Sequence, residues 1–222
     1  RRRLKSQPQN QPMTTHPRLF GTDGIRARAG HWPLTPEFTL RLGRAIGHLA
    51  RQRSDRPVII MGRDTRRSGH MLESALLAGL MAQGVDVMLL DEFTTPGVSF
   101  LTAHMRATLG IVVSASHNPY WDNGIKVFDG SGFKASDELE MQIEQLALGE
   151  ERDWHDNGLP GAVRLTRAPE QAYVGHLLRA FGGLLGGLLR LLGALCRLLC
   201  LLCGLLGGVL ILLSRLCGLL RL

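Results

Sequence analysis

Residues 113–126 have the sequence Val-Ser-Ala-Ser-His-Asn-Pro-Tyr-Trp-Asp-Asn-Gly-Ile-Lys, and the rest of the chain is arranged around this stretch. The apolar run over 109–113 leads into it and predicts a buried β-strand. Turn-forming residues follow, first Asn118-Pro119 and then Asp122-Asn123-Gly124. The stretch is therefore a loop that leaves the end of a buried strand, which is where α/β proteins place their chemistry.

The loop carries three side chains that could act in catalysis. Ser116 is a candidate nucleophile, His117 a candidate proton shuttle and Lys126 a nearby cation. A serine hydroxyl is a weak nucleophile and becomes reactive only with such help. These residues alone leave a second interpretation open, an ordinary turn rich in Ser, Asn and Gly, and Ser114 is a rival nucleophile.

Four motifs, found in the expected order, resemble the α-D-phosphohexomutase family. Residues 115–119, Ala-Ser-His-Asn-Pro, are similar to its phosphoserine loop, and residues 122–126 complete that match. Residues 20–26, Phe-Gly-Thr-Asp-Gly-Ile-Arg, resemble its N-terminal motif in the form typical of the phosphoglucosamine mutase branch. Residues 62–75 resemble the second block of that branch. The resemblance runs from about residue 19 to about residue 183.

The resemblance implies an activity. In the family, the serine that matches Ser116 carries a phosphate, donates it to the sugar, and receives the other phosphate of the resulting bisphosphate intermediate. The branch implies interconversion of glucosamine 6-phosphate and glucosamine 1-phosphate, a step towards cell-wall amino sugars. The expected partners are a phosphosugar and its bisphosphate, not nucleic acid. Phosphomannomutase or phosphoglucomutase activity, or a non-catalytic fragment, are the alternatives.

Carried over by position, the resemblance implies roles for eight residues. Four would be catalytic, with Ser116 as the phosphoserine and three neighbours that move protons or neutralise charge: His117, Lys126 and Arg26. Four would bind substrate or phosphate: Thr22, Asp23, Arg63 and Asn118. Phosphoryl transfer depends mainly on positioning and on charge neutralisation by cations, which fits this set. The residues around Arg63 also allow a salt-bridged turn without a phosphate.

Magnesium is the cofactor that the resemblance implies. In the family the ion is held by the serine phosphate, here on Ser116, and by three aspartates of an Asp-Gly-Asp-x-Asp-Arg loop. No such loop occurs among the 222 residues. Because a Lewis acid contributes several kcal/mol of transition-state stabilisation, we expect this chain alone not to turn over substrate.

Apolar runs and helical patterns alternate along the first 150 residues and predict an α/β fold. Strands are expected at 58–61, 85–90, 109–114 and 125–128. Helices are expected at 36–52, 70–83, 94–104 and 136–148. This alternation implies a mostly parallel sheet with helices on both faces, and it places the serine at the carboxyl edge of the sheet. The resemblance implies the same α/β/α architecture, that of the first phosphohexomutase domain.

We divide the chain into four parts. Residues 1–17, rich in Gln, Pro and Arg, form an extension that we expect to be disordered. Residues 18–150 form the α/β/α domain with the phosphoserine loop. Residues 151–183 form a linker and the start of a second domain, with a helix expected from 169 to 181. Residues 184–222 form a tail of low complexity.

The net charge of +7 belongs to the two ends of the chain. Between residues 6 and 183, 18 basic side chains face 19 acidic ones, so the composition does not indicate a nucleic-acid surface. All four cysteines lie in the tail, and no disulfide framework is expected elsewhere. Residues 1–12 lack the apolar stretch of a signal peptide. Both features favour a cytoplasmic location.

The tail, residues 184–222, departs from the family pattern. Twenty of its 39 residues are leucine, and it contains no acid, lysine or aromatic residue. No face is clearly reserved for water, so we do not expect a simple surface helix. Three interpretations compete: a membrane segment over the uncharged residues 198–214, a metal site at Cys196, Cys200 and Cys203, and an aberrant product of a shifted reading frame.

We favour the shifted frame, because Leu, Gly, Arg, Cys and Ala are what a GC-rich gene yields when it is translated out of frame. A membrane partner is then not expected unless the tail is natural. The hypothesis predicts that the nucleotide sequence beyond the codon for about residue 183 encodes an Asp-Gly-Asp loop in another frame. Sequencing of the gene checks this, and absence of the loop from every frame would rule the hypothesis out.

Overall fold

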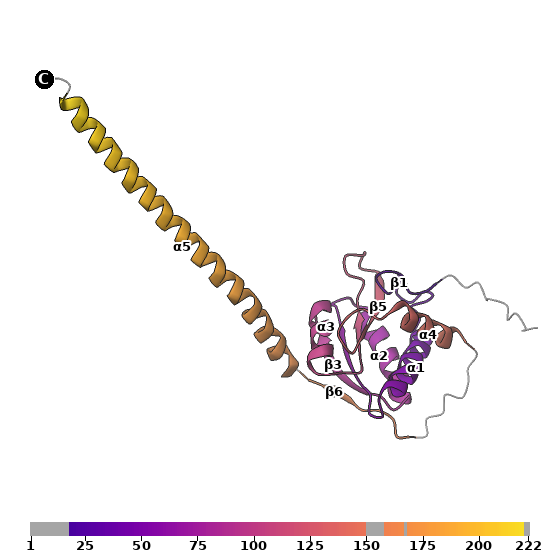
Figure 1. Ribbon diagram of the computed structural model, residues 1–222. Coiled ribbons are helices and arrows are strands. Elements are labelled where there is room, and N and C mark those ends of the chain that lie inside the picture. Colours follow the sequence, from indigo (N-terminus) through magenta and orange to yellow (C-terminus); the bar gives the residue numbers. More distant parts are fainter. Residues whose placement is uncertain (1–17, 150–157, 167, 220–222) are drawn as a thin grey trace, which may run out of the picture. The chain divides into compact units, whose positions relative to one another are not determined.

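The computed structural model describes residues 18–149, 158–166 and 168–219. It divides into two compact units, residues 1–169 and 170–222. In the described residues, the first unit consists of a six-stranded sheet and four helices (Figure 1). The strands are β1 (Ile25–Arg28), β2 (Val58–Arg63), β3 (Asp86–Glu92), β4 (Leu109–Val113), β5 (Asp122–Asp129) and β6 (Val163–Leu165). The helices are α1 (Pro36–Arg53), α2 (Gly69–Ala82), α3 (Thr95–His104) and α4 (Asp137–Leu148).

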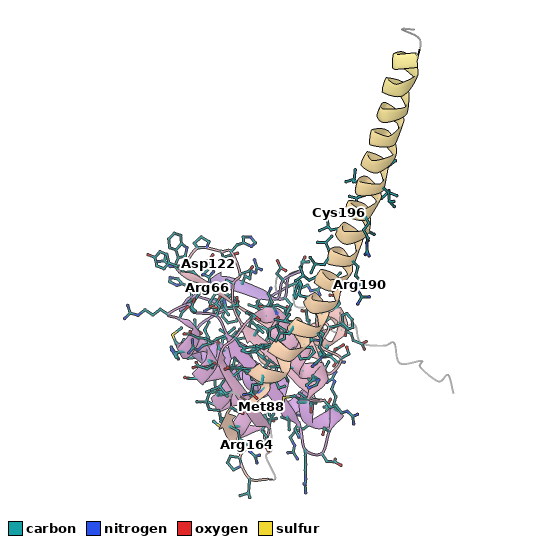
Figure 2. All side chains as sticks on the ribbon, turned by 90° about the vertical axis from the view of Figure 1, so that its left-hand side faces the viewer. Arg66, Met88, Asp122, Arg164, Arg190 and Cys196 are labelled. Carbon is teal, nitrogen blue, oxygen red and sulfur yellow. The ribbon has the colours of Figure 1, made fainter. Side chains whose placement is uncertain are left out.

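The sheet has the strand order β1-β5-β4-β2-β3-β6. Strands β4, β2, β3 and β6 are parallel, whereas β5 runs antiparallel to both β4 and β1. The mostly parallel α/β fold is therefore confirmed. The two edge strands were not expected from the sequence, because β1 has four residues and the three residues of β6 are all exposed. Figure 2 marks Met88 and Arg164, which pair where β6 joins β3.

Three helices begin at residues that suit the N-cap position. The Thr35 hydroxyl accepts a hydrogen bond from the Phe38 amide at 3.3 Å, and the Ser136 hydroxyl accepts one from the Leu139 amide at 3.2 Å. Thr94 caps α3 in the same way. Such caps satisfy backbone N–H groups that a helix cannot pair internally. These local interactions explain why the predicted starts of α1, α3 and α4 agree closely with the structure.

Helices cover both faces of the sheet. Side chains such as Ile59 and Ile111 join one core cluster with residues of α1, α2 and α4. Helix α3 lies on the opposite face (Figure 1), where a Cβ at Gly110 would clash with Thr102 and one at Gly62 would meet Val98. Because successive residues of a strand point to opposite faces, both faces of β4 are buried, as its uninterrupted apolar sequence predicts.

The register of the antiparallel strands places three motifs side by side. Val113, the last residue of β4, pairs with Ile125 of β5, and Arg26 of β1 pairs with Gly124. A side chain at Gly124 would lie 2.7 Å from the carbonyl oxygen of Ser114 and 2.8 Å from that of Ile25. Only glycine therefore allows β1 and the end of β4 to approach β5 this closely.

The described residues of the second unit belong to one helix, α5 (Ala168–Leu219), which has 52 residues and runs through the Leu-rich tail. Arg179, Arg190 and Arg197 recur along it at intervals of 11 and 7 residues and are all exposed. At 3.6 residues per turn these intervals place the three side chains within about 20° of one another around the helix. Composition does not reveal this alignment, because it depends on the helical register; the expectation that residues 184–222 reserve no face for water stays a prediction.

Candidate active site

The loop between β4 and β5, residues 114–121, presents Ser116 to solvent; we call it the serine loop. Ser114 and Ala115 are buried, whereas Ser116 and His117 are exposed. The backbone of Ser116 has a φ of 56°, in the left-handed region. This conformation costs a residue with a side chain about 1–2 kcal/mol, so the surrounding structure has to stabilise it. The nucleophile that we predicted thus lies at the most strained position of its loop.

Arg66 holds the serine loop from the neighbouring connection between β2 and α2. Its guanidinium donates hydrogen bonds to the backbone carbonyls of Ser116 and Asn118 at 2.8 Å, Pro119 at 2.5 Å and Asp122 at 3.1 Å. Figure 2 shows Arg66 and Asp122 next to each other. Since the Arg66 side chain is only 11% exposed, these charge-assisted bonds are largely shielded from water. We did not predict this role, because nothing in the sequence indicates that a cation will contact carbonyl groups.

Asp64 extends this network to the amide of the nucleophile. Its carboxylate accepts hydrogen bonds from Arg66 Nε at 3.0 Å and from the Ser114 hydroxyl at 2.7 Å. The Ser114 hydroxyl accepts in turn from the Ser116 amide at 3.1 Å. Ser114 is therefore buried and engaged by both neighbours, which leaves Ser116 as the hydroxyl that a substrate can reach.

Arg26 reaches the serine loop from β1. It donates a hydrogen bond to the side-chain oxygen of Asn118 at 3.0 Å and forms an ion pair with Asp23 at 3.1 Å. The side-chain nitrogen of Asn118 donates to Asp122 at 3.0 Å. Three residues predicted to act together, Arg26, Asp23 and Asn118, are thus brought into contact at the edge of the loop.

Lys126 lies on β5 and pairs with Val112, two residues before Ser114. Arg26 pairs with Gly124, so both cations project from the same face of the sheet. Among the residues that the structure describes, no hydrogen bond or ion pair to the Lys126 ammonium group is present, and the residue is half-buried. A cation in this situation can neutralise an incoming anion.

Thr22 and His117 do not join the network around Ser116. Thr22 is exposed in the turn that two backbone hydrogen bonds between Gly21 and Gly24 close, at 3.0 and 3.1 Å. His117 is exposed beside Ser116 in the chain. Across the described segments, neither side chain makes a hydrogen bond or ion pair, so each is free to turn towards a ligand.

The structure contradicts the phosphate-binding role predicted for Arg63. Its side chain is only 3% exposed and forms ion pairs with Glu73 at 3.4 Å, with Glu92 at 3.1 Å and with Asp91. The guanidinium is buried and already paired with three carboxylates, so a phosphate could neither reach it nor compete with those acids. The salt-bridged alternative is therefore the correct one, and the cluster ties the carboxyl ends of β2 and β3 to α2.

The residues present do not form a complete magnesium site. Within residues 18–149, 158–166 and 168–219, no group of three or more His, Cys, Asp or Glu side chains is placed to hold a metal ion. Near Ser116, the carboxylates of Asp64 and Asp122 accept hydrogen bonds from neighbouring side chains. Of the ligands that the family resemblance implies, this chain supplies only the serine.

Fold and site together define an α/β/α domain that presents one serine on a braced loop beside two cations. The α/β/α domain I of the phosphoglucomutase/phosphomannomutase family matches residues 17–153. The chain belongs to this family.

Curated relatives of the chain are phosphoglucosamine mutases, the branch of the family that its motifs resemble. The phosphoglucosamine mutase of Verminephrobacter eiseniae is 51% identical over 155 residues, which are 70% of this chain and 34% of that protein. The phosphoglucosamine mutase of Lawsonia intracellularis is 53% identical over 137 residues, or 62% of this chain and 30% of that protein. The chain thus spans about a third of the length of the curated relatives that it matches.

Solved structures share the fold. A phosphoglucomutase/phosphomannomutase family protein from Burkholderia thailandensis superposes with a TM-score of 0.57 at 26% identity, covering 69% of this chain and 34% of that one. The Paramecium phosphoglucomutase pp63/parafusin superposes with a TM-score of 0.58 at 19% identity, covering 73% of this chain and 34% of that one. The second likeness, at so low an identity, shows the fold alone.

We predict that Arg66→Met loosens the serine loop. Loss of the four carbonyl contacts should speed hydrogen exchange of the amides in residues 116–122 by about tenfold or more, since each tenfold corresponds to only ~1.4 kcal/mol of local stability. Mass spectrometry of proteolytic peptides measures the exchange. Arg67→Met, at an exposed neighbouring position, is the matched control and should leave these amides unchanged. Equal exchange in both variants would contradict the bracing role.

We predict that Arg63→Met destabilises the domain by about 3–5 kcal/mol at pH 7, because it leaves Glu73 buried without its cation. Burial raises the pKa of the Glu73 carboxyl above its ordinary value, and Arg63 partly offsets this. The native state therefore holds this proton more tightly than the unfolded chain does. The contribution of Glu73 to stability is full below its unfolded pKa of about 4.3 and is lost as pH rises through the higher folded value.

Since protonated Glu73 does not need the cation, the deficit of Arg63→Met should shrink when the pH is lowered from 7 to 4. Urea unfolding at both pH values, with Arg67→Met as the control, measures it. If the loss in free energy of unfolding caused by Arg63→Met grew on acidification, Glu73 would not be the group that the substitution leaves unpaired.

Proposed function

We propose that this domain carries the phosphoserine of a phosphoglucosamine mutase, with Ser116 as the residue that receives and donates the phosphoryl group. The observation that carries the proposal is the contrast between two nearby serines. Ser116 is exposed on a loop braced by Arg66, whereas Ser114 is buried and hydrogen-bonded to Asp64. Only the first hydroxyl can meet a sugar phosphate without rearrangement of the sheet edge.

The proposed reaction moves one phosphoryl group in each direction. In the first step the bond between phosphorus and Ser116 Oγ breaks, and a new bond forms to a free hydroxyl of the sugar monophosphate. The proton of that hydroxyl passes to a base, for which the exposed His117 is the nearest candidate in the sequence, and the departing Ser116 Oγ takes up a proton to become a free hydroxyl. In the second step Ser116 Oγ forms a bond to the other phosphorus of the bisphosphate while the bond between that phosphorus and its sugar oxygen breaks. The serine proton passes to a base and the sugar oxygen takes up a proton.

Two cations are suited to stabilise the charge that the transferring group spreads over its oxygens. Lys126 supplies an ammonium group that has no partner among the described residues, and Arg26 is oriented through Asn118 and Asp23. Because these groups are fixed by strands rather than by long loops, they need little reorganisation during the reaction. Thr22 lies in the adjoining turn and is proposed to contact the phosphosugar at the edge of the site.

Magnesium, when bound, would neutralise charge on the phosphoryl oxygens. The phosphate on Ser116 is the one ligand that we propose from this chain. The glucosamine substrate is proposed from the names of the relatives, and a cytoplasmic location from the absence of cysteine in residues 18–150.

The proposal predicts that residues 18–149 can replace the matching part of the Verminephrobacter eiseniae enzyme and support conversion of glucosamine 6-phosphate. In that chimaera Ser116→Ala should lower kcat by at least about 10³-fold, because the nucleophile is lost. Ser131→Ala, at an exposed position, is the matched control, and its kcat should stay within about twofold of that of the unsubstituted chimaera. A coupled assay for glucosamine 1-phosphate measures both. Normal activity of the Ser116→Ala chimaera would overturn the proposal. Conversion of glucosamine 6-phosphate by the present chain without the fusion would refute the separate expectation that this chain alone is inactive.

A further inference from the structure

Helix α5 exposes a large apolar surface. In the second unit, the leucines from 184 to 202 are between 48% and 72% exposed. Contiguous apolar surface of this extent is rare on soluble monomers, because each Å² left in water costs about 25 cal/mol. Of the described residues, Pro169–Leu199 also form one helix that is long and apolar enough to cross a membrane by length and composition. An apolar phase is therefore the environment that this surface fits.

After its first turn, which contains Glu170, α5 carries only positive charges. Arg179, Arg190 and Arg197 lie along one side of the helix, and no Asp, Glu or Lys follows Glu170 in the sequence. Guanidinium groups form bidentate hydrogen bonds with phosphate. A helix with a narrow cationic side and a wide leucine arc matches a surface that is apolar underneath and negatively charged above, which is the arrangement of an anionic lipid leaflet.

The length of α5 and the spacing of the arginines in Pro169–Leu199 favour an orientation of that part along the bilayer, whereas the uncharged run 198–214 has 17 residues, about the lower limit for a span. The 52 residues of α5 extend about 78 Å, more than twice the hydrocarbon thickness of about 30 Å. Within Pro169–Leu199, the longest uncharged run has 10 residues, from 180 to 189, and would cover only about 15 Å. Crossing there would draw an arginine into the hydrocarbon, whereas lying in the plane leaves all three at the headgroups.

We propose that the part of α5 from Pro169 to Leu199 binds in the plane of an anionic lipid bilayer, with its leucine arc among the acyl chains and Arg179, Arg190 and Arg197 on the headgroup phosphates. This inference is independent of the mutase proposal, since it uses no residue of the first unit. It applies to the chain as it stands.

The test uses the full chain and vesicles of phosphatidylcholine alone or mixed equally with phosphatidylglycerol. The chain should co-sediment with the anionic vesicles, less with the neutral ones, and less again as salt is raised. Replacing the arginines together, as Arg179→Gln, Arg190→Gln and Arg197→Gln, should weaken binding to the anionic vesicles by roughly 100-fold, at ~1 kcal/mol for each charge.

A matched control removes three exposed arginines of the first unit, as Arg51→Gln, Arg56→Gln and Arg106→Gln. It lowers the net charge equally and should retain the binding of the unchanged protein. Similar losses in the two triple variants would show a nonspecific effect of net charge and overturn the assignment to α5.

Oriented circular dichroism on stacked bilayers distinguishes the orientation. An in-plane helix signal supports the proposal, and a signal from helices along the bilayer normal overturns it in favour of a spanning segment. Failure to bind either vesicle, with reversible oligomers in sedimentation equilibrium, would overturn it in favour of association between copies of α5.

Discussion

The hydrogen bonds from one guanidinium to four backbone carbonyls are the constraint on which the candidate site depends. Arg66 gathers the carbonyl groups of Ser116, Asn118, Pro119 and Asp122, which would otherwise repel one another if turned inwards. The guanidinium has five N–H donors in a planar arrangement, so it can satisfy four carbonyls and still donate to Asp64, whereas a lysine ammonium group has only three donors. These hydrogen bonds therefore hold Ser116 in its strained conformation through the backbone, and its hydroxyl stays available for chemistry.

This bracing depends in turn on how the carboxyl ends of the parallel strands are held. Arg63 is the last residue of β2 and is buried among three carboxylates, so it fixes the point from which the next connection departs. Asp64 then orients Arg66 and Ser114 together. Two arginines three residues apart thus have different functions, because one turns towards acids on α2 and β3 and the other towards the backbone of the serine loop.

The two units show different relations between composition and structure. In the first unit, buried glycines such as Gly124 and Gly110 allow close packing of strands and of α3, so each has a tertiary reason. In the part of α5 whose side chains the structure describes, the leucines from 184 to 202 are exposed, and the helical register alone arranges Arg179, Arg190 and Arg197 along one side. Packing in the core accounts for the residues of the first unit, whereas the exposed leucines of α5 are accounted for by the lipid surface that we propose as its surroundings.

The sequence by itself determined most of the helices and strands and predicted Ser116 as the candidate nucleophile. Apolar strands such as β4, the cap at Thr35, and the Ala-Ser-His-Asn-Pro motif around Ser116 are local features, because turn and cap preferences depend on neighbouring residues. The tertiary structure alone decided the roles of Arg63 and Arg66, and the pairing of the short edge strands β1 and β6. The physical reason is that an arginine brings its charge to any fold, but its partner depends on which distant strands and loops the core places beside it.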